Sequence, residues 1–198
     1  SLMTRCAVCS KVKCYMRRGS MTKENGRILM ESHMLDVKNE REVVNASYAK
    51  SLADEEHLFI SLDDMSNAAT KLPNLRDCRS KKISDCDLVR ADLSGSILAK
   101  KYGDANYTVD LFVDVGNLYG AGSNSVLNFL ITSLNRFSKL PATLFLQVDG
   151  SRCNKNRVLF MFLSYIVEKG LFSKITVMFL PVGHSHAFAD RFFGVIRK

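Results

Sequence analysis

The chain has 198 residues, of which 46% are hydrophobic and 24% charged, so it can bury one sizeable core or two small ones and is not a disordered tail. Its longest apolar runs, at 158–163 and 177–182, are far shorter than the ~20 residues of a membrane-spanning helix, and its polar, basic start does not resemble a signal peptide. We therefore expect an intracellular protein without a membrane partner. Its six cysteines are irregularly spaced, which favours reduced thiols over disulfides in a chain of this size.

The net charge of +8 is unevenly distributed along the chain. Residues 1–50 contain ten Lys/Arg against five Asp/Glu, and residues 149–198 contain eight against three. Such a basic balance predicts an acidic partner, most often nucleic acid. Residues 51–70, by contrast, contain five acids and no Lys or Arg. This acidic segment is either a solvent-exposed loop or a set of carboxylates that hold metal ions beside a phosphate backbone.

Apolar periodicity and turn residues predict an alternation of strands and helices. The expected strands are 57–62, which Asp63 and Asp64 would end, then 87–93, 107–115, 142–148 and 174–182. Gly103 and Asp104 are a turn signal between the second and third strands. The expected helical regions are one or two helices within 20–52, a helix from Ser123 or Asn124 to about Lys139, another at about 156–169, and a last helix around Asp190.

From residue 57, the predicted order is strand, strand, strand, helix, strand, helix, strand, helix. This order is typical of the RNase H-like fold, an α/β fold with a mixed five-stranded sheet, whose first three strands are antiparallel, and with flanking helices. We expect a basic, cysteine-containing helical extension over 1–52 and the RNase H-like core over 53–198, with a last helix that could continue past residue 198. In that fold, catalytic carboxylates follow the first and fourth strands and lie on the last helix. Those places hold Asp63 or Asp64, Asp149 and Asp190.

Three segments of the sequence carry a more specific resemblance. They are HLFISLDDMSNAATKLPNL, LFLQVDGSRCNKNRVLFMFLSYIVEKGLF and ITVMFLPVGHSHAFADRFFGVIRK. They resemble a family of transposon-derived, DDE-type RNase H-like domains from eukaryotic mobile elements. In that family an Asp after a strand is followed by Asn-Lys-Asn, and later by Gly-His-Thr-His and a further Asp. The matching positions here are the three acids Asp63, Asp149 and Asp190, the polar signature Asn154-Lys155-Asn156, and the turn motif Gly183-His184-Ser185-His186.

The resemblance implies a metal-dependent nuclease or transposase that cleaves or joins DNA in recombination, with Asp63, Asp149 and Asp190 as catalytic residues. Two Mg²⁺ or Mn²⁺ ions, held by these acids with Asp64 as an alternative ligand, would activate the attacking oxygen and stabilise the leaving oxygen. It further implies transposon-end or target DNA as partner, a homo-oligomer and a nuclear location. The alternative is an inactive, domesticated or decayed relative that keeps the fold as a DNA-binding or interaction module.

Several basic and polar side chains are candidates for contact with nucleic acid. They are Arg17, Arg18, Lys155, Arg157, His184 and His186. The two histidines could instead ligate a metal ion, or hydrogen-bond the turn before the last helix. Asn154 could contact phosphate or metal-bound water, and it equally suits the N-cap of the following helix.

Near its start, the chain contains the spacing of a zinc knuckle. Cys6 and Cys9 form a Cys-x-x-Cys pair, and Cys14 and His33 are the candidates to complete a zinc site. The alternative is free thiols on a short basic segment. If zinc is bound, the segment that carries Arg17 and Arg18 would be a small, rigid nucleic-acid-binding appendage to the catalytic core.

Overall fold

The computed structural model describes residues 6–65, 70, 83–89, 91–102, 105–115, 122–179, 183 and 188–196. In chain order, its elements are α1 (Ala7–Arg17), α2 (Lys23–Ala53), β1 (His57–Asp64), the 3₁₀ helix η2 (Asp85–Asp87), β2 (Ala91–Tyr102), β3 (Ala105–Val115), α3 (Ser123–Leu134), β4 (Thr143–Val148), α4 (Arg157–Glu168), β5 (Lys174–Phe179) and α5 (Phe188–Ile196). Among the described helices, none combines the length and the apolar character needed to cross a membrane.

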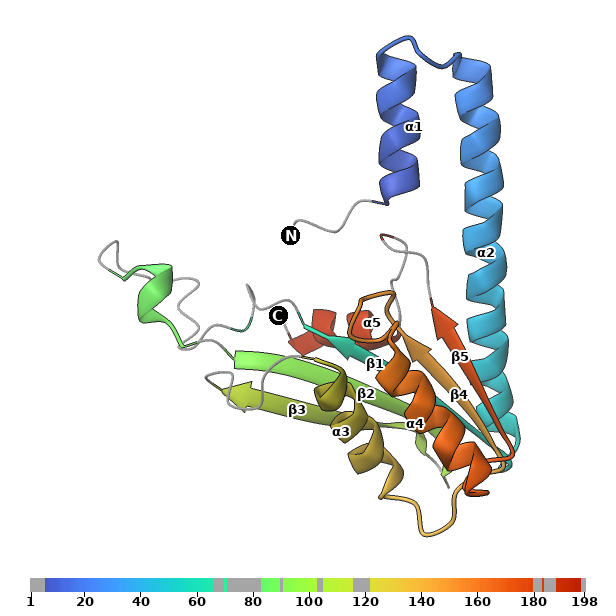
Figure 1. Cartoon of the computed structure of the whole chain (residues 1–198), viewed down its shortest axis with the longest axis vertical. Helices are drawn as coiled ribbons and strands as arrows, with labels where there is room; N and C mark the ends of the chain where they lie inside the picture. The colour runs from blue at the N-terminus through green and yellow to red at the C-terminus, as the bar shows by residue number, and fades with distance from the viewer. Residues whose placement is uncertain are drawn as a thin grey trace.

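The five strands form one mixed sheet in the order β3-β2-β1-β4-β5 (Figure 1). β1 pairs antiparallel with β2, and β2 pairs antiparallel with β3. β4 joins β1 in parallel, and β5 joins β4 in parallel. The chain therefore has the predicted α/β class, with an open mixed sheet and flanking helices. The parallel strands β1, β4 and β5 end at the same edge of this sheet.

One face of the sheet packs against α3 and α4 (Figure 1). Alternate side chains of the central strands point to this face, among them Ile60 of β1 and Leu146 of β4, both with no exposed surface. They meet Leu130 of α3 and Leu159 of α4, which are also fully buried. Burial of a large aliphatic side chain contributes about 1.5–3 kcal/mol, so this layer is the main source of stability for the sheet region.

The opposite face packs against α5 and the C-terminal half of α2. Phe59 of β1 is fully buried there with Val44 and Tyr48 of α2 and Phe188 of α5. α5 approaches β2 closely at Gly95, because a Cβ on that residue would lie 2.9 Å from Cζ of Phe193. The absence of a side chain at position 95 thus lets the last helix lie against the sheet.

At the N-terminus, α1 and α2 form an antiparallel hairpin that projects from the sheet region (Figure 1). Gly19, with φ of +70°, allows the left-handed turn between the two helices. Thr22 caps α2 by accepting a hydrogen bond from the Asn25 backbone N–H (3.2 Å). The predicted helical region 20–52 is therefore a single long helix from Lys23, and the cysteine-containing segment before it is also helical.

Three predicted elements have other limits in the structure. The first strand, predicted over 57–62, continues through Asp63 and Asp64, which pair with β2. The second strand, predicted over 87–93, spans Ala91–Tyr102. It begins later because Ser84 and Asp87 exchange hydrogen bonds in a capping box that favours a helical turn, and it ends later because its pairing with β3 continues to Tyr102. α3 ends at Leu134 rather than near Lys139, where Phe137 folds back against the core. The predicted turn at positions 103 and 104 lies outside the described residues.

Candidate active site and candidate metal centre

Asp64 and Asp149 lie at the carboxyl ends of two adjacent parallel strands, β1 and β4. Strand alternation places Asp64 on the same face as Leu62, which belongs to the core beneath α3 and α4. Asp63 therefore points to the opposite face. There it is paired with Gly95, over which Phe193 of α5 lies. Because the two acids are neighbours in a strand, they belong to different faces of the sheet.

The carboxylate of Asp64 stands in a region of surplus negative charge. Partial burial among surrounding atoms raises the pKa of Asp64, and the negative charges of Asp149 and Asp92 raise it further. A hydrogen bond from the Ser94 hydroxyl opposes this shift in part. Asp64 retains solvent exposure at the strand end, so a cation could reach it. A divalent cation would relieve the repulsion among these acids.

Asp149, which directly follows β4, is held by the loop that leads to α4. Its Oδ1 accepts hydrogen bonds from the Ser151 backbone N–H (3.1 Å) and from Nδ2 of Asn154. Asn154 is only 8% exposed, and its Oδ1 has no hydrogen-bond partner among the described residues. A buried amide oxygen without a partner carries an energetic penalty, which a bound cation or water could remove.

The structure does not place Asn154 at the N-cap of α4, one of the two roles considered for it. Asn156 is the N-cap, since its side chain accepts a hydrogen bond from the Leu159 backbone N–H (3.0 Å). Asn154 instead bonds to Asp149. The two asparagines of the Asn154-Lys155-Asn156 motif thus have separate roles: Asn154 orients Asp149, and Asn156 caps α4.

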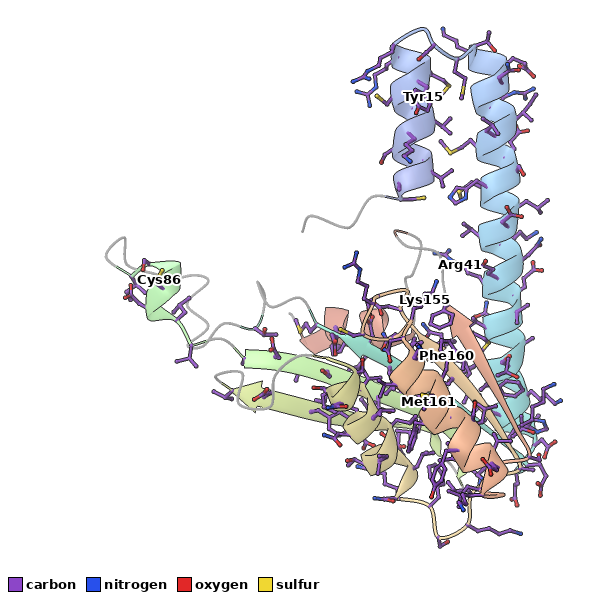
Figure 2. All side chains as sticks on the ribbon, viewed as in Figure 1. Tyr15, Arg41, Cys86, Lys155, Phe160 and Met161 are labelled. Atoms are coloured by element: carbon purple, nitrogen blue, oxygen red, sulfur yellow. The ribbon has the colours of Figure 1, made fainter. Side chains whose placement is uncertain are left out.

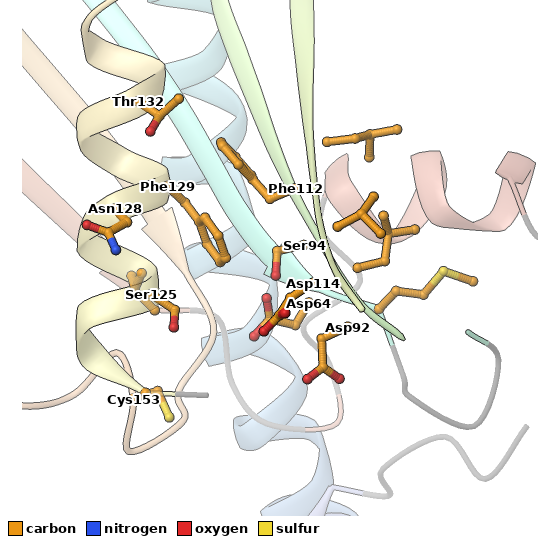
Figure 3. Close-up of a pocket in the computed structure, with 16 residues that line it drawn as sticks. Asp64, Asp92, Ser94, Phe112, Asp114, Ser125, Asn128, Phe129, Thr132 and Cys153 are labelled. Carbon is orange, nitrogen blue, oxygen red and sulfur yellow. The ribbon is translucent and has the colours of Figure 1, made fainter. Parts of the chain in front are cut away.

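A cavity of about 550 Å³ opens between the ends of β1–β3 and α3 (Figure 3). The acids Asp64, Asp92 and Asp114 line it together with Ser94, and Asp92 pairs with Asp114 across β2 and β3. Its apolar wall includes Phe112 and Phe129, whose rings stack with centroids 4.4 Å apart. Asp64, Asp92 and Asp114 lie at the same end of the cavity in Figure 3, with the carboxylate of Asp92 directed away from the other two.

Sequence reasoning missed Asp92 and Asp114. The sequence contains a feature that predicts their pairing: both residues lie 11 positions from residue 103, where the turn was expected. Once the second strand is extended to Tyr102, a hairpin centred there pairs them on one face.

The remaining predicted residues are distributed over several parts of the chain. Asp63 accepts a hydrogen bond from the Asp64 backbone N–H (2.9 Å). The backbone of Asp190 belongs to α5, but its side chain, like all of His184 and His186, lies outside the described part of the chain. Lys155 is exposed beside the N-terminal end of α4, with Nζ 4.6 Å from the ring centroid of Phe179 (Figure 2).

The other basic residues predicted to contact nucleic acid are exposed, one at the start of α4 and two at the end of α1. Arg157 is the first residue of α4, and Arg17 and Arg18 stand at the C-terminal end of α1. Arg17 and Arg18 therefore lie at the closed end of the projecting hairpin, away from the acids at the sheet edge (Figure 1).

The hairpin contains a separate cluster of potential metal ligands: Cys6, Cys9 and His33. Their ligand atoms all lie within 4.8 Å of one another, and Sγ of Cys6 is 3.2 Å from Nε2 of His33. Cys6 is buried, and the other two are partly buried. This cluster could hold a metal ion. Cys14, which we considered as a fourth ligand, is not part of it.

Burial raises the pKa of the Cys9 thiol, and the neighbouring Cys6 raises it further. A raised pKa favours the protonated form of the Cys9 thiol. Within the described ranges, this is the one group of three His, Cys, Asp or Glu side chains whose ligand atoms approach so closely. The acids at the sheet edge are spaced more widely.

Residues 81–198 match the model of a family described as a domain of unknown function, DUF7869. This match covers more than half of the chain. The chain belongs to the DUF7869 family. The DUF7869 segment contains Asp92, Asp114, Asp149 and Asn154, whereas β1 with Asp64 and the α1–α2 hairpin precede it. Comparison of the chain with curated proteins finds no match.

Proposed function

We propose that the sheet region is an RNase H-like, DDE-type polynucleotidyl transferase or nuclease core that cleaves or joins DNA phosphodiesters with two Mg²⁺ or Mn²⁺ ions. The observation that carries this proposal is the juxtaposition of Asp64 and Asp149 at the ends of the adjacent parallel strands β1 and β4, where the charge of Asp149 adds to burial in raising the pKa of Asp64. The resemblance of three sequence segments to transposon-derived domains supports it independently.

The strand pairings also support the RNase H-like assignment. β1, β2 and β3 are joined by antiparallel pairings, and β4 and β5 are added in parallel with helices in the connections. α5 then returns to the face of β1 and β2 opposite α3 and α4, with Asp190 in its first turn. In such a fold, an acid on the last helix contributes to the site; α5 lies on the face of β1 to which Asp63 points, so Asp190 would join Asp63 there, while Asp64 lies on the face of α3 and α4.

The donor set fits hard divalent cations. Carboxylate and amide oxygens are the ligands that Mg²⁺ and Mn²⁺ prefer. Asp64 and Asp149 supply the carboxylates, and Asn154 has a buried Oδ1 without a partner among the described residues. Asp63 and Asp190, which the sequence predicts as catalytic acids together with Asp149, are further candidate ligands. When bound, the ions would activate a water or a 3′-hydroxyl and stabilise the leaving oxygen.

The side chains of this chain would orient the reactants. The Ser94 hydroxyl fixes the carboxylate of Asp64, and the Asn154 amide fixes that of Asp149. Lys155 and Arg157 are exposed close to Asp149 in the chain and would contact DNA phosphates. Arg17 and Arg18, on the hairpin, would extend this electrostatic contact. A role on DNA further implies a nuclear location and, for joining two DNA ends, a homo-oligomer.

For the cysteine–histidine cluster, we propose that the ion is Zn²⁺. Thiolate sulfur and imidazole nitrogen are its usual ligands, and the cluster supplies two of the first and one of the second. Zn–S bonds of about 2.3 Å and Zn–N bonds of about 2.0 Å are compatible with ligand atoms less than 4.8 Å apart.

One observation favours the alternative, a non-catalytic DNA-binding relative. Among the described acids at the sheet edge, no three have ligand atoms as close together as those of the cysteine–histidine cluster. A bound divalent cation would draw such acids together, because it offsets their mutual repulsion. The two functions differ in the chemistry that follows cation binding.

Cleavage of a pre-nicked or branched DNA substrate in Mn²⁺ separates these functions. We expect the wild-type chain to cleave or join the substrate, and Asp149→Asn to lose at least about 100-fold in rate because a charged ligand is removed. Retention of DNA by Asp149→Asn, measured in the same buffer, controls for folding. Wild-type protein that binds DNA but does not cleave it in Mg²⁺ or Mn²⁺ would instead establish the non-catalytic alternative.

A further inference from the structure

Helix α1 has few features that would stabilise it by itself. α1 has 11 residues, a length at which an isolated helix is marginally stable in water. Its N-cap, Cys6, makes no side-chain capping bond, and its first turn contains no acid to interact with the helix dipole. Val12 is the one residue between Ala7 and Arg17 that is buried. The helix therefore depends on its packing against α2.

That packing is tightest at the closed end of the hairpin. Gly26 of α2 lies beneath Met16 of α1, and a Cβ at position 26 would be 2.3 Å from the Met16 sulfur. Val12 is buried about one turn further along α1. At the open end, α1 meets α2 through Cys6, Cys9 and His33. The cluster thus joins the first turn of α1 to the middle of α2.

The cluster is poorly suited to fasten this end without a cation. Across the two helices, Sγ of Cys6 contacts Nε2 of His33 (3.2 Å), and sulfur forms only weak hydrogen bonds. A soft cation would displace the thiol protons and replace weak contacts with coordinate bonds to both helices. Because two of the three ligands lie on α1 and the third lies 27 residues from Cys6, binding would also close a long loop of chain.

We propose that a zinc ion held by Cys6, Cys9 and His33 is a folding clasp, so that α1 docks on α2 when the ion is bound and detaches when it is removed. This inference rests on the zinc assignment proposed above and is independent of nuclease activity. The three side chains leave one position of a tetrahedral zinc ion for a further donor. Docking would hold Arg17 and Arg18 in a fixed place at the closed end of the hairpin.

The test uses the full chain and two measurements. Replacement of zinc by Co²⁺ reports binding, because thiolate ligands give intense charge-transfer absorption and a tetrahedral site gives strong visible bands. Hydrogen exchange of α1 amides then reports docking, with and without a chelator. We expect one ion per chain, and at least a tenfold faster exchange in α1 when it is removed, while the amides of β1 and β4 are unchanged.

Matched variants locate the ligands. Cys9→Ser and His33→Gln should lose the cobalt spectrum and show fast α1 exchange even with metal present. Cys14→Ser makes the same change in the same helix, outside the cluster, and should keep both the spectrum and slow exchange. Protected β1 amides in every variant would show that the sheet remains folded.

Two results would overturn the inference, and they differ. If wild type binds no ion, or Cys9→Ser binds it as well as wild type, the zinc assignment itself fails. If the ion binds to these three residues but its removal leaves α1 exchange unchanged, the site exists and the clasp does not. Neither result depends on whether the sheet region cleaves DNA.

Discussion

The hairpin cluster and the acidic edge of the sheet bring their polar side chains together in different ways. In the hairpin, three side chains that can be uncharged approach within 4.8 Å of one another. At the sheet edge, the pKa of Asp64 is raised, first because burial disfavours its charged form and then because the charges of Asp149 and Asp92 repel it. Uncharged ligands do not repel one another when two helices bring them close, whereas carboxylates need a cation to offset their repulsion. The two regions are accordingly suited to different metals, one soft and one hard.

The largest effect we expect is a difference between two neighbouring acids. Asp64→Asn should lower Mn²⁺-dependent cleavage by about 100-fold or more, since its carboxylate faces the charges of Asp149 and Asp92. Asp63→Asn should lower it by less than about tenfold, because Asp63 lies on the other face of β1. Single-turnover rates of both variants on one DNA substrate make this comparison. The reverse order of effects would return the role of first acid to Asp63.

The second effect concerns stability. Leu146, with no exposed surface, lies at the centre of the sheet, and Leu146→Ala should lower the free energy of unfolding by about 2–5 kcal/mol through the cavity it leaves. This loss should be the same with zinc and with a chelator, because the core does not depend on the clasp. Met161→Ala is the control, since Met161 is 68% exposed on α4 (Figure 2) and its loss should change stability by less than about 0.5 kcal/mol. Denaturant titrations followed by circular dichroism measure both, and a zinc-dependent loss for Leu146→Ala would contradict the separation of the two regions.

A third effect tests whether the hairpin contacts DNA. Replacement of both Arg17 and Arg18 by Gln should flatten the slope of log affinity against log salt by roughly one to two units, as expected for two lost phosphate contacts. The matched control is Arg27→Gln with Lys38→Gln, which removes two charges that already pair with acids on α2. Equal slopes for wild type and the Arg17/Arg18 variant would show that the hairpin does not touch the DNA backbone.

The smallest effect is a pH dependence. The folded-state pKa of Asp64 is raised, so folding favours its protonated form, and stability falls as pH rises from the unfolded pKa through the folded one. Asp64→Asn removes this loss. Without divalent cations, the melting temperature of the variant at pH 7 should be roughly 1–2 °C above that of wild type, a small difference because the carboxylate is exposed. Near pH 3, where Asp64 is protonated in both states, the two proteins should melt at the same temperature. Thermal melts across this range decide the point, and a variant that is less stable at pH 7 would contradict the sign.

The sequence predicted the parts of the molecule that depend on local pattern. Periodicity or spacing predicted the strand 107–115, the strand that precedes Asp149, the helix that begins near Asn156 and the Cys6–Cys9 pair. Of the two residues considered to complete that pair, His33 lies in the cluster and Cys14 does not. The limits of β2 were not predicted, because a Ser84–Asp87 capping box competed with the strand pattern. Which of two adjacent acids faces Asp149 was also undecidable from spacing. It depends on which face of β1 the core covers, and both faces are covered by helices here.

Asp92 and Asp114 show the same limit. Their approach requires the register of β2 on β3, which sets residues far apart in the chain opposite each other. The role of Asn154 could not be predicted either. Its position in the sequence suits an N-cap, but Asn156 caps α4, and the buried Oδ1 of Asn154 has no hydrogen-bond partner among the described residues. These features come from tertiary packing, and only the folded chain displays them.

The central claim is that the acids at the ends of β1 and β4 hold divalent cations. A crystal structure of the full chain with Mn²⁺, measured at a wavelength where manganese scatters anomalously, tests it most directly. The account predicts an anomalous peak bonded to carboxylate oxygens of Asp64 and Asp149, at the roughly 2.1 Å typical of small divalent cations. At saturating Mn²⁺, an empty sheet edge with ordered Asp64 and Asp149 side chains would contradict it.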